Sequence, residues 1–347
     1  MRKKQLIQGG VLLAAAAVAL LVTIHFQTAT YTIQIPDALD TVSEISVTTD
    51  QNGNVILKEC EEYIREMDRL FSPTNPESDV CKINSAAGTG TTVLVDARTA
   101  DILSRAQQYS VETSGFFDVT VGSIVNIWNE AQETGTLPAP ESISEAIHDV
   151  GFRNFEVNRN DNTVILDKQH VDITLGGIAK GYITDGLVAM LREKGVSSAL
   201  INLGGNTYAL GEKAERTPWN IGIQDPNDPE RLIGSVQVEN QCVITSGDYQ
   251  RYFELDGVRY HHIMNPNTGM PSRSGLRSVT IIGEDATLAD ALSTACFVLG
   301  YSEGSHLISQ YPGVTAVFVT DTNTVYYSGA LEDVFERSNQ NYEYRRF

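Results

Sequence analysis

The fold class follows from one segment, Tyr252-Phe253-Glu254-Leu255-Asp256-Gly257-Val258-Arg259-Tyr260. Asp-Gly is a preferred pair for the two-residue turn of a β-hairpin, because both positions of that turn need a positive φ. We therefore expect antiparallel strands at 252–255 and 258–260. A chain that contains such a hairpin does not fit a series of parallel βαβ units alone.

Further strands and helices interleave on both sides of this hairpin. Alternating β-branched and polar residues predict strands within 28–50, and apolar residues three to four apart predict a helix over 55–70. The expected fold is α+β: a mixed, largely antiparallel sheet with packed helices. The other expected strands are 155–158, 163–167, 198–203, 219–223, 233–238, 278–282, 314–319 and 324–328, and the other helices are 98–113, 142–149, the later part of 175–194 and 287–299.

The first 27 residues predict a secretory signal peptide or a membrane anchor. Cations at positions 2–4 precede an apolar run over 9–26, which is the order typical of such segments. Because the basic side stays in the cytoplasm, we expect the chain from Thr28 onward outside it, attached to the membrane, or secreted if the segment is cleaved. The expected organisation is this segment over 1–27, one domain over 28–335, and a polar, loosely ordered tail over 336–347.

The charge and the cysteines exclude some classes of protein. The formal net charge of −19 argues against non-specific nucleic-acid binding, which needs a basic surface. The four cysteines form no C-x-x-C pair, so zinc-ribbon and thiol-redox motifs are absent. We expect them to be small core residues; a disulfide between Cys60 and Cys81 is permitted outside the cell but is not established by the sequence.

Asp290 and Thr294 lie four residues apart on the helix expected over 287–299, so they project from one face. A carboxylate and a hydroxyl placed in this way offer two hard oxygen ligands, which suit magnesium. The alternative is a capping box in which Asp290 pairs with Thr287 and only holds the start of the helix.

Two glycine-containing segments are candidate ligand-binding turns. Leu175-Gly176-Gly177-Ile178-Ala179-Lys180 precedes a helix, where exposed N–H groups and a lysine favour an anionic group. Asn202, Gly204 and Gly205 follow a short apolar strand and offer amides and backbone groups to a ligand. The alternatives are an ordinary tight turn for the first segment and a strand-terminating turn for the second.

Histidines and aromatic residues mark the remaining candidate positions. His261 and His262 are adjacent, and if they lie on a strand only one of them faces a site. A histidine has a suitable pKa to accept a proton from an attacking hydroxyl. Phe116 and Phe117, next to Asp118, offer aromatic rings for a flat heterocycle, although core packing is the alternative for at least one of them.

Taken together and in this order, the segments resemble the ApbE family, the FAD:protein FMN transferases. The resemblance extends from about Ser43 to Leu331. The segments that carry it are Phe71-Ser72 with Ser78-Asp79 and Ile83-Asn84, Ser114 to Gly122, Leu175 to Asp185, Ile201 to Asn206, Ser246 to Phe253, His261 to Gly269, and Asp290 to Ala295.

The resemblance implies an enzyme that moves FMN from FAD to a Thr or Ser hydroxyl of an acceptor protein and releases AMP, with Mg²⁺ required. The implied acceptor is a membrane redox subunit or another extracytoplasmic flavoprotein. In this sequence Asp290, Thr294 and the Gly177 carbonyl resemble the magnesium ligands. His262 resembles the catalytic base, with His261 as the second candidate. The positions that resemble FAD contacts are Phe116, Phe117, Asp118, Lys180 and Ile263.

One position departs from the family pattern, which has an aspartate six residues before the lysine; here that residue is Thr174. Either Thr174 makes a neutral hydrogen bond to FAD, or the nearby Asp172 reaches the cofactor by another route. Two alternative functions stay open from the sequence. One is an FAD pyrophosphatase that passes FMN to water, and the other is a non-catalytic flavin-binding protein.

Overall fold

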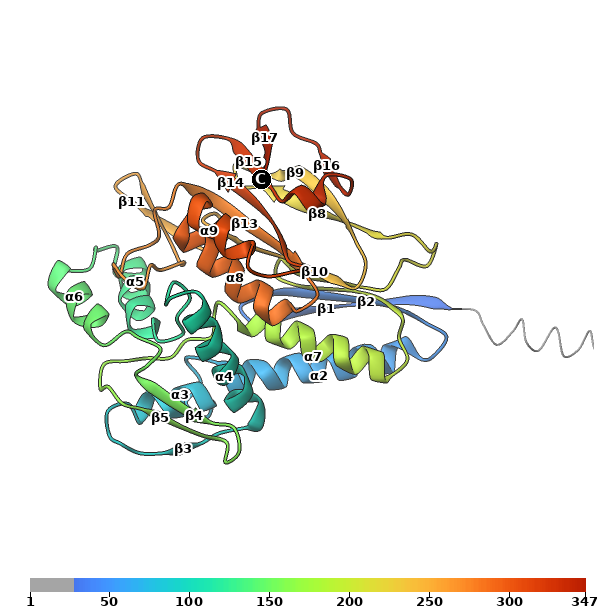
Figure 1. Cartoon of the computed structure of the whole chain (residues 1–347). Coiled ribbons are helices and arrows are strands. Elements are labelled where there is room, and N and C mark those ends of the chain that lie inside the picture. Colours follow the sequence, from blue (N-terminus) through green and yellow to red (C-terminus); the bar gives the residue numbers. More distant parts are fainter. Residues whose placement is uncertain (1–27) are drawn as a thin grey trace, which may run out of the picture.

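A nine-stranded sheet forms the centre of the molecule in the computed structural model, which describes residues 28–347 (Figure 1). Neighbouring strands pair antiparallel, except the last pair, which is parallel. This arrangement confirms the predicted α+β fold. The strand order is β1 (Ala29–Ala38), β2 (Thr41–Thr49), β6 (Ser198–Leu203), β7 (Asn206–Leu210), β10 (Gln241–Gly247), β13 (Leu276–Gly283), β14 (Thr315–Thr320), β15 (Thr324–Tyr327) and β17 (Glu343–Arg346).

Successive residues of the central strands face two different cores. In β14, Phe318 belongs to one hydrophobic core, and its neighbours Val317 and Val319 belong to the other. This is the period of two expected for a strand covered on both faces. Helices cover one face: α2 (Gly53–Phe71), α7 (Ala179–Glu193), α8 (Ala286–Leu299) and α9 (Tyr301–Ile308). A three-stranded sheet covers the other: β16 (Phe335–Arg337), β9 (Asp228–Val238) and β8 (Trp219–Asp225).

The chain between α2 and α7 builds a smaller region beside the main sheet, at the lower left of Figure 1. Side chains that precede its helices define where they begin: Ser78 accepts a hydrogen bond from the Cys81 N–H, and Asp96 accepts one from the Arg98 N–H. Its helices are α3 (Asp79–Ser85), α4 (Ala97–Glu112), α5 (Gly122–Thr134) and α6 (Pro140–His148), and its strands are β3 (Val93–Leu94), β4 (Phe155–Asn158) and β5 (Thr163–Leu166).

The predicted hairpin is present as β11 (Tyr252–Leu255) and β12 (Val258–His261). Asp256 and Gly257 both have positive φ, of 50° and 75°, as an Asp-Gly turn requires. The hairpin forms a two-stranded sheet of its own and does not join the central sheet. It projects from the body at the upper left of Figure 1.

The expectation of a loosely ordered tail over 336–347 is wrong. Residues of this segment form β17, which pairs parallel with β15, and Arg337 ends β16. Two tyrosines explain the order: Tyr342 is buried and its hydroxyl bonds to Asp225 Oδ1, and the Tyr344 hydroxyl bonds to the Ile233 carbonyl. A short 3₁₀ segment, η1 (Gly329–Leu331), precedes the tail in the chain, and the Gly329 N–H donates to the Phe347 carbonyl over 2.9 Å.

The predicted signal peptide or anchor over 1–27 lies outside the described residues. Within residues 28–347 no helix combines the length and the apolar character needed to cross a membrane. All four cysteines are free thiols, so Cys60 and Cys81 are not joined. Three of the four are buried, as expected of core residues, whereas the Cys81 side chain is only half-buried and its thiol lies 3.1 Å from the Pro73 carbonyl oxygen.

Candidate active site

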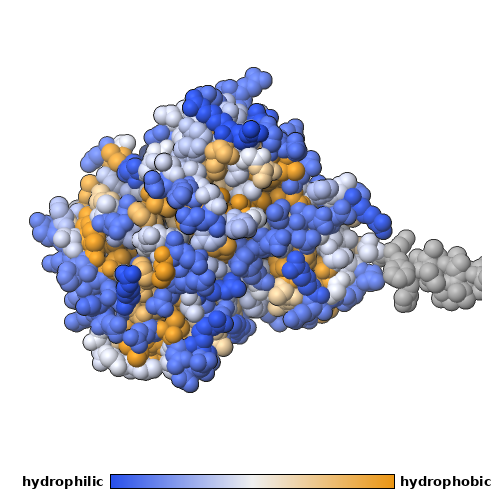
Figure 2. All heavy atoms as spheres, in the orientation of Figure 1, coloured by the Kyte–Doolittle hydropathy of each residue, from blue (hydrophilic) through white to orange (hydrophobic). Residues whose placement is uncertain are grey.

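A cleft of about 370 Å³ opens between the smaller region and the face of the sheet that carries α7 and α8. Its walls come from the β1–β2 turn, the end of α2, the 116–121 segment, α5, the 174–180 turn, the end of β10, the β11–β12 hairpin and α8. Figure 2 shows a mainly hydrophilic surface around the small apolar patches of this side of the molecule. The predicted site residues that line the cleft are Phe116, Phe117, Asp118, Thr174, Gly177, Lys180, His261, His262, Ile263, Asp290 and Thr294.

Asp290 lies inside α8 and is not part of a capping box. The N-cap of α8 is Asp285, whose carboxylate accepts a hydrogen bond from the Leu288 N–H. Asp290 is 3% exposed, and its Oδ2 accepts a hydrogen bond of 2.9 Å from the Gly181 N–H of α7. Because Asp290 lines the cleft with its other oxygen free of protein partners among the described residues, it is available to a ligand.

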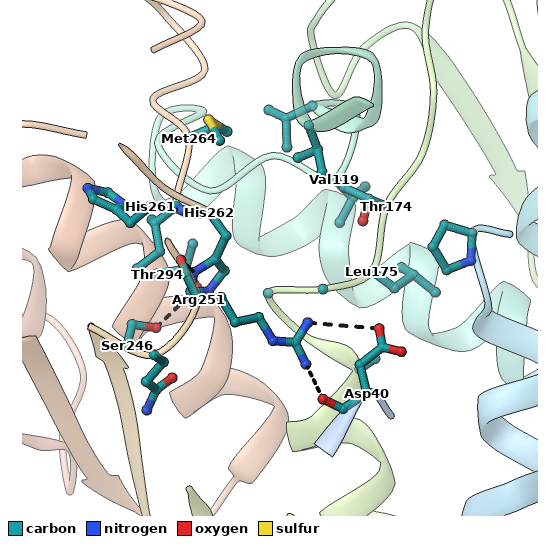
Figure 3. Close-up of a pocket in the computed structure, with 18 of the residues that line it drawn as sticks. Asp40, Val119, Thr174, Leu175, Ser246, Arg251, His261, His262, Met264 and Thr294 are labelled. Atoms are coloured by element: carbon teal, nitrogen blue, oxygen red, sulfur yellow. Dashed lines mark hydrogen bonds and ion pairs between the residues drawn. The ribbon is translucent and has the colours of Figure 1, made fainter. Parts of the chain in front are cut away.

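The 174–180 turn comes close to Thr294. A Cβ added to Gly177 would lie 3.2 Å from Thr294 Oγ1 and 3.4 Å from the Phe117 ring, so a larger residue would crowd this approach. The Ser246 hydroxyl, at the end of β10, is 3.5 Å from Thr294 Oγ1 (Figure 3). Ser246 was not predicted, although it stands in a segment that carried the family resemblance.

These groups form a set of hard oxygen donors. One carboxylate, two hydroxyls and a glycine backbone next to them suit a hard divalent cation such as Mg²⁺ better than a soft metal. The residues present therefore fit the ion that the sequence suggested. Residues 28–347 contain no group of three or more His, Cys, Asp or Glu side chains placed to hold a metal.

His262 has one ring nitrogen hydrogen-bonded and the other without a partner among residues 28–347. Its Nδ1–H donates to the Arg251 carbonyl over 3.1 Å, and its backbone N–H donates to the same oxygen. With the proton held on Nδ1, the Nε2 lone pair is left to accept another. The ring has surface open to the cleft, yet the surrounding protein lowers the pKa of His262 to about 4, chiefly by removing water. The Lys180 and Arg251 charges act in the same direction, while the Arg251 carbonyl opposes them.

His261 has no free ring nitrogen. Its Nε2 donates to the Ser272 carbonyl over 2.8 Å, and its Nδ1 accepts from the Ile263 N–H over 3.2 Å. The ring is buried against Phe297, and burial lowers the pKa of His261. The arrangement therefore favours His262 over His261 as the base, and gives His261 the role of holding the loop that carries both.

The residues proposed to contact the flavin differ in how free they are. Phe117 is buried, whereas Phe116 is partly exposed at the cleft wall. Asp118 has both oxygens engaged: Oδ1 by the Thr120 N–H and hydroxyl, and Oδ2 by the Phe152 N–H. Burial raises the pKa of Asp118, and these bonds oppose that shift. Its carboxylate thus stabilises the 116–121 loop.

Thr174 and Asp172, the two residues considered in place of the expected aspartate, lie differently relative to the cleft. Thr174 lines the cleft, and its N–H donates to the Val119 carbonyl. Asp172 is not among the residues of the cleft wall, and its Oδ2 accepts a hydrogen bond from Asn126. A side chain six residues before Lys180 therefore faces the cleft as a neutral hydroxyl.

Asn202, Gly204 and Gly205 are not among the residues that line the cleft, so their ligand-binding role stays a prediction. They form the turn between β6 and β7, in which Asn202 Oδ1 accepts from the Gly205 N–H. Both glycines have positive φ, and a Cβ added to Gly205 would lie 3.4 Å from Gln250 of the cleft wall. The strand-terminating turn is thus present, and it lies beside the cleft.

Arg251 and the β1–β2 turn are cleft residues that the sequence did not indicate. The Arg251 guanidinium donates to the carbonyls of Leu39 and Asp40 and lies 3.9 Å from the Asp40 carboxylate (Figure 3). Asp40 and Leu39 are separated from Arg251 by more than two hundred positions, so no local pattern announces the contact. Their carbonyls fix the position of the residue whose own carbonyl orients His262.

Comparison with known protein families and structures identifies the class of protein that has this fold. The ApbE family model matches residues 30–318, and the chain belongs to that family.

Relatives of known sequence and structure agree with the assignment. The chain is 35% identical to the FAD:protein FMN transferase of Treponema pallidum (strain Nichols) over 80% of either chain. It is 33% identical to one from Klebsiella pneumoniae (strain 342), over 81% of this chain and 87% of that protein. The crystal structure of the ApbE protein of Thermotoga maritima superposes with a TM-score of 0.81 at 35% identity, covering 89% of this chain and 100% of the other. The apo flavinyl transferase ApbE of Pseudomonas stutzeri gives 0.79 at 26% identity, covering 90% and 99%.

Proposed function

We propose that this enzyme is an FAD:protein FMN transferase that uses Mg²⁺ and delivers FMN to a Thr or Ser hydroxyl of an extracytoplasmic acceptor protein, with AMP as the second product. Family membership and the names of its relatives support flavin transfer from FAD to protein. The observation that carries the finer proposal is one cleft that holds both a histidine with a free Nε2 and a set of hard oxygen donors.

The reaction replaces the phosphoanhydride bond between the two halves of FAD with a phosphoester bond to the acceptor. The acceptor hydroxyl oxygen forms a bond to the phosphorus of the FMN half, and the bond from that phosphorus to the AMP oxygen breaks. His262 Nε2 takes the hydroxyl proton, and AMP leaves with the electron pair of the broken bond. A positioned base of this kind contributes roughly 10²–10⁴-fold in rate.

Other residues of the chain bind and orient the reactants. Asp290, Thr294 and the Gly177 carbonyl would hold the cation, which when bound neutralises charge on the diphosphate. Lys180, in the first turn of α7, adds a positive charge beside the glycine turn. Phe116 offers an aromatic face at the wall.

The proposed location outside the cytoplasm rests on the sequence of the first 27 residues. Their basic start and apolar run support an extracytoplasmic domain tethered to the membrane, or secreted after cleavage. The acceptor that fits this location is a membrane redox subunit or another extracytoplasmic flavoprotein with an accessible Thr or Ser.

The test is incubation of the purified full-length chain with FAD, MgCl₂ and a candidate acceptor protein. Flavin fluorescence that stays on the denatured acceptor, with AMP released in equal amount, supports transfer. Free FMN and AMP without a labelled acceptor would instead show an FAD pyrophosphatase, and FAD recovered intact would show a binding protein. A Thr-to-Val change at the labelled acceptor position identifies the attachment site.

A further inference from the structure

α7 and α8 are joined by two aspartates, one from each helix, which accept hydrogen bonds from backbone N–H groups of the other helix. Asp185 of α7 accepts hydrogen bonds from the N–H groups of Ala286 and Thr287, each 2.9 Å long, at the start of α8. In return, Asp290 of α8 accepts one from Gly181 at the start of α7. Each helix thus supplies the acceptor for backbone donors that the other leaves without an intrahelical partner.

These reciprocal hydrogen bonds limit how far each helix can slide along the other. The Thr287 hydroxyl also donates to Asp185 Oδ2, so this carboxylate accepts three hydrogen bonds from one helix start. One turn earlier on α7, a Cβ on Gly181 would lie 2.2 Å from the carbonyl oxygen of the same Ala286. The two helices pack side by side against the sheet at this point (Figure 1).

The packing of α7 against α8 also determines where the oxygen donors of the cleft lie relative to one another. Gly177 belongs to the turn that leads into α7, and Asp290 and Thr294 belong to α8. Their oxygens converge only if the two helices keep one register. From these contacts we infer that Asp185, which does not line the cleft, is a positioning residue that holds this donor set in the geometry a divalent cation needs.

This inference rests on the proposed function, and it deepens it by naming what pre-organises the metal site. Donors fixed by partners outside the coordination sphere bind metals better, and loss of such partners typically costs roughly 10–100-fold in affinity. A carboxylate is suited to the task because both of its oxygens are acceptors. An asparagine at position 185 would turn its NH₂ group toward a backbone N–H and displace the start of α8.

The experiment compares two charge-matched variants of the full-length chain. Asp185→Asn disrupts the hydrogen bonds from α7 to the start of α8 and leaves the bond between Asp290 and Gly181. Asp285→Asn removes the same charge from the same helix start, but its remaining oxygen can still cap the Leu288 N–H, and it makes no bond to α7. Mn²⁺ is titrated into FAD-saturated protein without an acceptor, and binding is followed by the loss of the free Mn²⁺ electron paramagnetic resonance signal, with FAD alone as the blank.

We expect the Mn²⁺ dissociation constant to rise roughly tenfold for Asp185→Asn and to stay within about twofold of the wild type for Asp285→Asn. The FAD dissociation constant, measured by flavin fluorescence without metal, should stay within about twofold for both. Saturating Mg²⁺ should restore most of the transfer rate of Asp185→Asn. An unchanged Mn²⁺ affinity, or equal losses in the two variants, would overturn the inference.

A milder variant keeps the test decisive if Asp185→Asn does not fold. Thr287→Val removes only the hydroxyl that donates to Asp185 and keeps both charges. A loss of Mn²⁺ affinity larger than that of Asp285→Asn supports the inference, and a loss no larger overturns it. Wild-type protein that binds no Mn²⁺ would overturn the proposed metal itself, whereas normal wild-type binding with unchanged variants would refute only the role of Asp185.

Discussion

Two adjacent histidines acquire different roles from the backbone groups around them. His261 has both ring nitrogens bonded to backbone atoms, whereas in the part of the chain that the structure describes only Nδ1 of His262 has a partner. The tautomer of each ring is set by these bonds, as is usual for histidines that act as bases or structural links. The distinction between a base and a support is therefore a property of single atoms, which residue type alone does not show.

Replacing His262 by alanine should separate chemistry from binding. We expect the transfer rate to fall by roughly 10²–10⁴-fold, because the acceptor hydroxyl loses its proton acceptor. The FAD dissociation constant should change by less than about threefold. Single-turnover transfer and flavin fluorescence titration measure the two quantities. Equal losses in both would identify His262 as a binding or structural residue instead.

The acid limb of the pH profile of transfer should reflect the lowered pKa of His262. Since the surrounding protein removes water from part of the ring, and nearby cations act in the same direction, this pKa falls to about 4 and the ring stays neutral as the pH falls below 6.5. The acid limb of kcat/KM should thus lie below the ordinary histidine range. The unfolded chain binds the proton more readily, so the contribution of this group to stability falls as the pH drops from 6.5 toward 4. An acid limb centred near 6.5, seen at several FAD concentrations, would contradict this.

At the scale of the elements, one close contact fixes α7 against α8. Gly181 faces backbone, the Ala286 carbonyl at 2.2 Å from an added Cβ, so the contact has no flexible side chain that could move away. Gly186, one turn further along α7, faces only the hydroxyl end of Tyr63. The two glycines of one helix thus offer a matched pair for testing which contact matters to the site.

Gly181→Ala should destabilise the protein by about 1–3 kcal/mol, the usual range for overpacking in a close contact. It should also lower transfer, because Asp290 moves with α8. Gly186→Ala should cost less, since the Tyr63 side chain can rotate, and it should leave transfer near the wild-type rate. Thermal unfolding and transfer assays at saturating Mg²⁺ compare the two. Identical effects would mean that the register of α7 and α8 does not limit the site.

The sequence predicted the position of residues correctly where they are related by the regular spacing of a single helix. The four-residue spacing of Asp290 and Thr294 correctly placed both on one helix face toward the cleft. The role predicted for Asn202 and its two glycines stays a prediction, since their turn lies near Gln250 of the cleft wall without lining the cleft itself. The sequence did not indicate Arg251 and Asp40, because a contact between residues this far apart in sequence depends on strand order.

At the scale of the whole molecule, the cleft lies where two hydrophobic cores meet. α8 and Phe117 of the 116–121 segment belong to the main core, whereas Trp128 of α5, on the wall of the same cleft, belongs to a smaller one. A ligand in the cleft contacts residues of both cores and binds the folded state only. Its binding free energy is therefore added to the stability of the whole chain.

FAD and Mg²⁺ should consequently raise the unfolding temperature in two separable steps. A ligand at a hundredfold excess over its Kd stabilises the folded state by about 2.7 kcal/mol, which corresponds to a rise of several degrees for a domain of this size. We expect FAD alone to give part of the rise, Mg²⁺ to add more only when FAD is present, and EDTA to reverse that second part. Asp290→Ala should keep the first step and lose the second, together with transfer activity, because the cation loses its carboxylate; the unliganded protein should also unfold at a lower temperature, because the Gly181 N–H loses its acceptor. Differential scanning fluorimetry at matched ionic strength, with Ca²⁺-free buffers and NaCl as the salt control, measures both steps.

A second step that persists in Asp290→Ala would show that the cation binds elsewhere. A rise with Mg²⁺ in the absence of FAD would show that the cation site is complete without the dinucleotide.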